Sequence, residues 1–106
     1  MSIIIVGAGE IGYNLARELS IEKKDVVIIE ANPEKVDQLE EAGEDITMIQ
    51  GSGSNPEVLK KAGIEQAELL VAVTESDERN IVACYIASKL RSEEHTSELQ
   101  SRKSNS

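Results

Sequence analysis

Four short apolar runs, each followed by an amphipathic segment, organise residues 1–90 of the chain. The runs are rich in Ile, Val, Leu and Met, which is typical of strands buried on both faces of a parallel sheet. They cover residues 2–6, 25–30, 45–50 and 69–73. The alternation of strands and helices predicts an α/β fold, a Rossmann-like doubly wound parallel sheet. Because each crossover is right-handed, the expected strand order, numbered along the chain, is 3-2-1-4.

Capping residues indicate where the intervening helices begin and end. The first helix is expected over residues 10–21, with Ile11, Leu15 and Leu19 on its buried face. Asn-Pro pairs predict the starts of two further helices, and a glycine is expected just past the end of each. These are Asn32 and Pro33 with Gly43, and Asn55 and Pro56 with Gly63.

A last helix is expected after residues 69–73. Thr74 and Asp77 have the spacing of a capping box, so Thr74 is expected to cap a helix that runs to Leu90. The single cysteine, Cys84, is expected to be a buried small hydrophobe on this helix, and Tyr85 to pack among its apolar neighbours.

Residues 91–106 have a different composition, dominated by Ser, Glu and Arg. This segment resembles the in-frame translation of a sequencing-library adapter, so we expect a disordered, non-native tail. His95, the one histidine of the chain, lies in it, and we therefore expect no histidine base and no metal site. Residues 1–90 are expected to be part of a nucleotide-binding domain whose natural sequence continues beyond Leu90.

The turn after the first apolar run carries the pattern Gly-x-Gly-x-x-Gly. Gly7 allows a tight turn, Gly9 allows a pyrophosphate to approach the backbone, and Gly12 allows the helix to pack closely on the strand. The N–H groups and the dipole of the helix that follows favour phosphate. We therefore expect this turn to bind a dinucleotide through Gly7, Ala8, Gly9, Glu10, Ile11 and Gly12.

An acidic residue, Glu30, ends the second run roughly 20 residues after the glycines, as the dinucleotide fingerprint requires. Its carboxylate can accept hydrogen bonds from ribose hydroxyls and would repel a 2′-phosphate. The expected cofactor is therefore NAD or NADH, with ATP or ADP as less favoured alternatives. Residues after the third and fourth runs lie at the same edge of the sheet, so Gly51, Ser52, Val73 and Thr74 are further candidates for nucleotide contact.

Purely structural interpretations of these residues remain open. Glu30 can end a strand at the surface, Gly51 and Ser52 can belong to an ordinary loop, and helix capping by itself explains Thr74.

The net charge of −9 argues against nucleic acid as a partner, because binding it requires a positive field. A single cysteine excludes an internal disulfide and suits a reducing cytosol.

Longer blocks of the sequence resemble one family, the RCK-N (KTN, or TrkA-N) regulatory domain of bacterial Trk potassium-uptake systems. The similar blocks are residues 7–12, Glu30, 50–59, 62–64 and 70–80. The resemblance implies a cytoplasmic, NAD-binding subunit, peripheral on the inner face of the plasma membrane. It also implies a homo-oligomeric ring of like domains that binds a membrane potassium-translocating subunit and gates potassium flux. One departure is Gly51-Ser52, where many relatives have Gly-Asp.

The alternative function is the cofactor-binding fragment of an NAD-dependent dehydrogenase. Tyr85 and Lys89 fit the Tyr-x-x-x-Lys pair of short-chain dehydrogenases, in which the lysine lowers the pKa of a tyrosine that acts as a general acid. In that family the motif lies further along the chain, after a fifth strand, and the glycine turn has a different spacing. We therefore expect no enzymatic activity.

Overall fold

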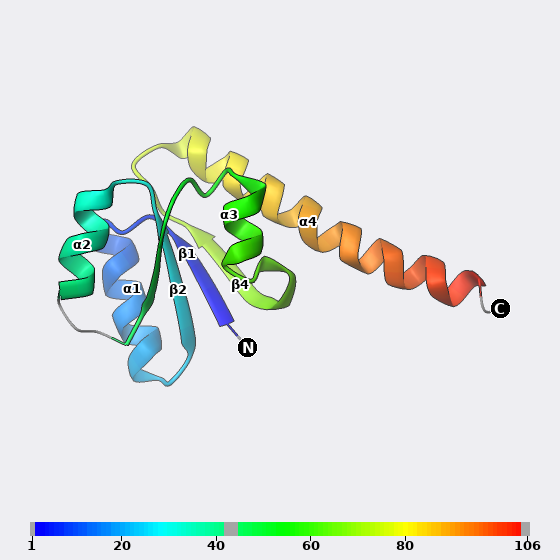
Figure 1. The fold of residues 1–106 in the computed structure, drawn as a ribbon, viewed down its shortest axis with the longest axis horizontal. Helices are drawn as coiled ribbons and strands as arrows, with labels where there is room; N and C mark the ends of the chain where they lie inside the picture. The colour runs from blue at the N-terminus through cyan, green and yellow to red at the C-terminus, as the bar shows by residue number, and fades with distance from the viewer. Residues whose placement is uncertain (1, 42–44, 105–106) are drawn as a thin grey trace.

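The computed structural model describes the backbone of residues 2–41 and 45–104, and the side chains of these residues up to residue 92. One parallel sheet has the strand order β3-β2-β1-β4, with helices on both faces (Figure 1). The strands are β1 (Ser2–Val6), β2 (Asp25–Glu30), β3 (Thr47–Gln50) and β4 (Ala67–Ala72). The predicted fold class and strand order are confirmed.

The helices divide between the two faces of the sheet as right-handed crossovers require. Helices α1 (Glu10–Ile21) and α2 (Pro33–Glu41) lie on one side (Figure 1). The other side carries α3 (Pro56–Lys61), a short 3-10 turn η1 (Ile64–Gln66) and α4 (Asp77–Ser104). The strand order reverses at β1, so the loops after β1 and β4 diverge to opposite faces and leave room for a ligand between them.

The central strand β1 is buried on both faces. Ile4 and Val6 belong to the core cluster under α3 and α4, whereas Ile3 and Ile5 belong to the cluster under α1 and α2. Full burial of one such side chain contributes about 1.5–3 kcal/mol. The two clusters together fix β1 in the middle of the sheet.

Helix α1 packs on the sheet through small residues. Gly12 and Ala16 are buried, and Leu15 and Leu19 pack at the edge of the contact. Ile11 is 70% exposed, so the prediction that it lies on the buried face is wrong. The start of α1 lies too close to β1 for a large side chain, and the buried stripe therefore runs through Gly12 instead.

Several boundaries differ from the predicted ones by one or two residues. Strand β3 begins at Thr47 and not at residue 45, and β4 covers Ala67–Ala72 and not 69–73. The register of β4 against β1 shifts so that Glu68 has no partner, because Ser2 pairs with Ala67 and Ile3 with Leu69. Gly63 follows α3 with φ of 89°, as predicted for a helix end, whereas Gly43 lies outside the described residues.

Helix α4 continues to Ser104, so the predicted helix end at Leu90 is wrong. The expectation that residues 91–106 are disordered stays a prediction. Neither Gly nor Pro occurs after Gly63 to end the helix. Figure 1 shows the second half of α4 extending away from the sheet. Whether residues 91–106 are foreign to the domain stays a prediction.

The most buried residues of α4 are small, Ala83 and Ala87, and the larger Ile86 and Leu90 pack partly buried against the same core cluster. Cys84 is exposed, and Tyr85 is 62% exposed, so both were wrongly predicted to be packed. At about 100° per residue, positions 84 and 85 turn away from the stripe that contains 83 and 87.

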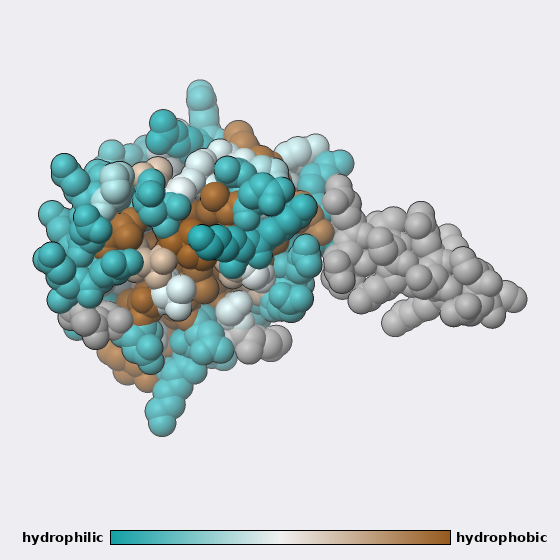
Figure 2. All heavy atoms as spheres, viewed as in Figure 1, coloured by the Kyte–Doolittle hydropathy of each residue, from teal (hydrophilic) through white to brown (hydrophobic). Residues whose placement is uncertain are grey.

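Apolar side chains are also visible at the surface. In Figure 2 hydrophobic residues in the middle of the globular part are bordered by polar ones. Leu69 on the edge strand β4 is 49% exposed.

Among the described residues, no helix has the length and hydropathy needed to cross a lipid bilayer.

Candidate functional site

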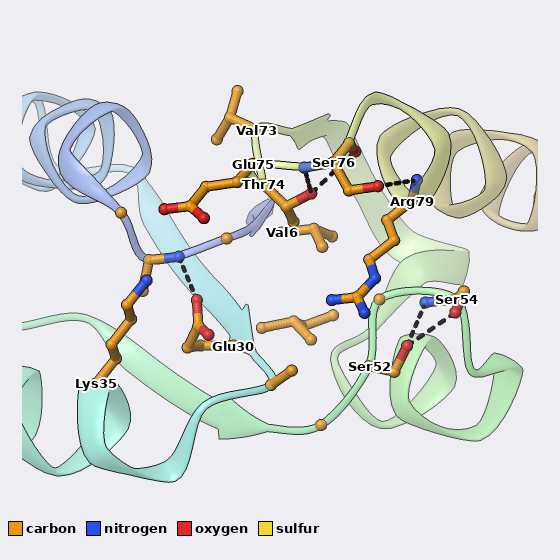
Figure 3. A pocket seen from close by; sticks show the side chains of 17 residues that line it. Val6, Glu30, Lys35, Ser52, Ser54, Val73, Thr74, Glu75, Ser76 and Arg79 are labelled. Carbon is orange, nitrogen blue, oxygen red and sulfur yellow. Dashed lines mark hydrogen bonds between the residues drawn. The ribbon is translucent and has the colours of Figure 1, made fainter.

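A cavity of about 660 Å³ lies at the carboxyl ends of all four strands (Figure 3). Its volume falls within the usual range of about 300–1,000 Å³ for small-molecule sites. The lining comes from the last residues of β1 and β2, from the loops that follow the four strands, and from the first turns of α2 and α4. Nucleotide contacts are predicted at this same edge of the sheet. The residues that line the cavity are Val6, Gly7, Ala8, Gly9, Ile29, Glu30, Ala31, Lys35, Gly51, Ser52, Gly53, Ser54, Val73, Thr74, Glu75, Ser76 and Arg79.

Backbone hydrogen bonds hold these loops together just past the strand ends. Gly7 N–H donates to the Ile29 carbonyl at 2.9 Å, and Gly51 N–H donates to the Glu30 carbonyl at 2.9 Å. On the other side, Val73 N–H donates to the Val6 carbonyl at 2.8 Å. The parallel ladder therefore extends into the loops and fixes the floor of the cavity.

The three glycines of the first turn have three different reasons to lack a side chain. Gly7 has φ of 112°, and a Cβ there would lie 3.0 Å from Thr74 N. A Cβ on Gly12 would overlap the Gly7 carbonyl oxygen. A Cβ on Gly9 would meet no protein atom within 4 Å, so the protein itself has room for a side chain at this position. Gly9 lines the cavity, which fits the expectation that its missing side chain leaves space for a ligand.

Glu30 is only 9% exposed, and both of its carboxylate oxygens accept hydrogen bonds from the backbone. Ala8 N–H donates to Oε1 at 2.7 Å, and Asn32 N–H donates to Oε2 at 2.8 Å. The side chain thus joins the glycine turn to the loop after β2 (Figure 3). Its carboxylate is not a free strand end at the surface, and any ribose contact would use the lone pairs that remain on these oxygens.

The loop after β3 is packed closely on β1 and on α3. A Cβ on Gly53 would overlap Val6 Cγ1, and a Cβ on Gly51 would lie 2.9 Å from Val58 Cγ2. The hydroxyls of Ser52 and Ser54 lie 2.8 Å apart, and Ser54 N–H donates to Ser52 Oγ at 3.1 Å. The close packing of the two glycines holds this serine pair at the rim of the cavity.

The loop after β4 is held by Asn80, one of the residues in the family-like block. Asn80 Oδ1 accepts from Thr74 N–H at 2.8 Å and lies 2.6 Å from Thr74 Oγ1, and Asn80 Nδ2 donates to the Thr74 carbonyl at 3.2 Å. Ser76 Oγ accepts from Arg79 N–H at 3.2 Å, the geometry of an N-cap. The prediction that Thr74 caps α4 is therefore wrong, because Thr74 precedes a turn that places Ser76 at the cap.

The structure brings together most of the predicted site residues. Eight of them line the cavity: Gly7, Ala8, Gly9, Glu30, Gly51, Ser52, Val73 and Thr74. The other three do not: Glu10 lines a smaller hollow between α1 and α2, Ile11 is exposed, and Gly12 packs against the Gly7 carbonyl.

Two basic side chains that the sequence analysis did not propose, Lys35 and Arg79, also line the cavity. They extend from α2 and α4 on opposite sides of it (Figure 3). Each lies shortly after a strand end, and that position was the one sequence signal that could have identified them.

A family model for the TrkA-N domain matches residues 3–105. The chain belongs to the TrkA-N domain family. Curated relatives include proteins named "Trk system potassium uptake protein TrkA" from Azorhizobium caulinodans, 44% identical over 94 residues, and from Haemophilus influenzae, 45% identical over 84 residues. These alignments cover 85% and 79% of this chain but 19% and 18% of the relatives. The TrkA-N chain thus spans about a fifth of the length of these relatives.

Solved structures share the fold. The TrkA-N domain of the inner membrane protein ybaL from Escherichia coli is 30% identical with a TM-score of 0.60, over 67% of this chain and 51% of that one. The NAD(P)-binding domain of an exopolyphosphatase-related protein from Archaeoglobus fulgidus has a TM-score of 0.74 at 20% identity, over 83% and 65% of the two chains. A putative short-chain dehydrogenase/reductase from Aeromonas hydrophila has a TM-score of 0.62 at 17% identity, over 86% and 53%. The last two show the fold alone.

Proposed function

We propose that this TrkA-N chain binds NAD or NADH in the cavity at the carboxyl ends of its strands. The observation that carries the proposal is Gly9, where a side chain would meet no protein atom although the position lines the cavity. A glycine that the packing of the chain does not require is best explained by a ligand that needs the space. The turn it belongs to opens α1, whose N-terminus favours a phosphate group.

The proposed contacts follow the loops. The pyrophosphate lies at the glycine turn, over residues 7–12, and the adenosine ribose lies near Glu30. The serine pair at the rim, Ser52 and Ser54, supplies hydroxyls for the adenosine. The negative charge of Glu30 disfavours the 2′-phosphate of NADP, so NAD is preferred over NADP.

The cellular role we propose is that of a regulatory subunit of a potassium-uptake system. It rests on membership of the TrkA-N family and on relatives named for Trk potassium uptake. In this role the chain belongs to a cytoplasmic protein that forms a ring of like domains under a membrane potassium-translocating subunit. Nucleotide binding gates the flux only to the extent that one conformation of the ring binds the nucleotide better than the other.

A dehydrogenase function has less support. Tyr85 and Lys89, the pair that suggested it, do not line the cavity. Lys89 Nζ lies 5.7 Å from the centroid of the Tyr85 ring, and both residues are exposed on α4. A general acid must reach its substrate, so these two residues do not supply one at this site.

Calorimetric titration of the chain with NAD, NADH, ADP, ATP and NADP tests the binding proposal. We expect NAD or NADH to bind more tightly than the other three. The variant Gly9→Val is expected to keep the thermal midpoint of the wild type and to lose nucleotide binding. Wild-type affinity in Gly9→Val would rule out the proposed pyrophosphate position.

The regulatory role needs a separate experiment in the context of a full-length relative. Residues 1–90 of this chain would replace the matching segment of the Azorhizobium caulinodans protein, and potassium uptake would be measured with and without NADH. We expect nucleotide-dependent uptake from the chimera, and its loss when the chimera carries Gly9→Val. If the chimera binds NADH but its potassium uptake does not change with NADH, the gating role is wrong.

A further inference from the structure

The cavity has a basic side chain on the side of β4 and α4. Arg79 lies in the first turn of α4, which is fixed by the bond from Arg79 N–H to Ser76 Oγ at 3.2 Å. Figure 3 shows the side chain extending from α4 into the cavity, toward the loop that carries Ser52 and Ser54. Lys35 lies on the opposite side, beside the glycine turn (Figure 3). The guanidinium of Arg79 therefore faces the part of the cavity that is further from the expected phosphates.

That part of the cavity combines an apolar floor with a polar rim. Val6 and Ile29, from β1 and β2, line the cavity, and Gly53 packs directly on Val6. The hydroxyls of Ser52 and Ser54 stand at the rim, 2.8 Å apart. An apolar surface with a few polar groups at its edge suits a flat heteroaromatic ring whose edge forms hydrogen bonds.

A flat ring also needs a partner for its second face. Among the described residues that line the cavity, none is aromatic. A guanidinium group is planar, delocalised and weakly hydrated, and it stacks on π-systems, which an ammonium group does much less well. Arg79 is the residue placed to provide this second face.

We propose that Arg79 stacks on the adenine ring of the bound nucleotide and thereby contributes to its affinity. The inference rests on the proposed function, because it requires a nucleotide with its phosphates at the glycine turn. The competing role for an arginine is that of a counter-charge for phosphate. A lysine at this position distinguishes the two roles. It can still act as a counter-charge for phosphate, but it has no planar group to stack on a ring.

The experiment titrates NAD into the 106-residue chain at two salt concentrations. The variants are Arg79→Lys and Arg79→Ala, with Arg91→Lys and Arg91→Ala as matched controls about three turns further along the same helix. Arg79 is exposed, so its two variants are expected to keep the wild-type thermal midpoint. Arg91 is half-buried, so the thermal midpoints of its variants are measured before the titrations. We expect both Arg79 variants to raise the Kd for NAD by a similar factor, about 3- to 10-fold, with an unchanged salt dependence. The Arg91 variants should bind as the wild type does.

Binding of a ligand without a base provides a readout that a general loss of stability would not produce. Inorganic pyrophosphate has no ring on which Arg79 can stack, so it should bind to both Arg79 variants and to the Arg91 variants with its affinity for the wild type. If Arg79→Lys binds like the wild type while Arg79→Ala weakens binding and lowers the salt dependence, Arg79 binds phosphate and the stacking role is wrong. If the wild type binds NAD and Arg79→Ala binds it equally well, only the Arg79 assignment fails. If the wild type binds no NAD, both the proposed function and the Arg79 assignment are wrong.

Discussion

The loops after β1 and β4 line the same cavity, but different chemistry holds each of them. The β1–α1 loop depends on partners far away in the chain, since Ala8 N–H donates to Glu30 and the Gly7 turn fits against Thr74 and Val73. The β4–α4 loop is bonded to β1 at its first residue, where Val73 N–H donates to the Val6 carbonyl. Its remaining hydrogen bonds are local and join Thr74, Ser76 and Asn80. The comparison indicates that the first loop forms only when the sheet forms, whereas the second can form its turn locally.

The largest expected effect separates packing from ligand binding within the glycine turn. Gly12→Ala should destabilise the fold by about 2–3 kcal/mol, because the new Cβ overlaps the Gly7 carbonyl and α1 must move away from β1. Gly9→Ala, its matched control, should change the free energy of unfolding by less than about 1 kcal/mol. Urea denaturation of both variants measures the difference. Equal stabilities would mean that α1 does not approach β1 as closely as described.

A second experiment removes the distant partner of the β1–α1 loop. Glu30→Ala should cost about 1–3 kcal/mol of stability, because the buried Ala8 N–H loses its acceptor. It should also weaken NAD binding by roughly 1–3 kcal/mol and reduce the discrimination against NADP. Denaturation and calorimetric titration of the same preparation measure the two effects. If the stability of Glu30→Ala is unchanged, the carboxylate contributes only to ligand binding. If its NAD affinity is unchanged, the carboxylate contributes only to holding the loop.

A third experiment disrupts the locally held loop. Asn80→Ala should cost about 1–2 kcal/mol, because Thr74 N–H loses its acceptor and the Thr74 carbonyl its donor. Hydrogen exchange should accelerate more at Thr74 and Ser76 than at Ala8, because the acceptor of Ala8 N–H is Glu30 and not a residue of the β4–α4 loop. The exposed Asn14 on α1 offers a control, Asn14→Ala, which should alter neither region. Equal acceleration at Ala8 would show that the two loops unfold together.

The smallest effect concerns the distal part of α4. Deleting residues 91–106 should change the free energy of unfolding by less than about 0.5 kcal/mol and leave NAD affinity unchanged, as expected for a segment that does not belong to the domain. Thermal midpoints of the full chain and of residues 1–90 measure the change in stability. A midpoint several degrees lower after the deletion would mean that the segment packs on the domain.

Sequence patterns with a local physical cause predicted the structure well. Continuous apolar runs identified the strands, right-handed crossovers gave their order, and Asn55 and Gly63 marked the ends of α3 correctly. Errors arose where helical periodicity alone was used to assign burial. Ile11 and Tyr85 have apolar neighbours at helical spacing, yet both are exposed, because glycine and alanine occupy the most buried positions of α1 and α4.

By itself the sequence determined the fold class, the strand order and the edge of the sheet at which the cavity lies, because these follow from periodicity, chain handedness and glycine conformation. Only the tertiary structure decided what the side chains at that edge do. In the folded chain both carboxylate oxygens of Glu30 accept hydrogen bonds from backbone N–H groups. Thr74 bonds to Asn80 and does not cap a helix, and Lys35 and Arg79 line the cavity. Such contacts depend on distances between segments far apart in the chain, and no local pattern of residues specifies these distances.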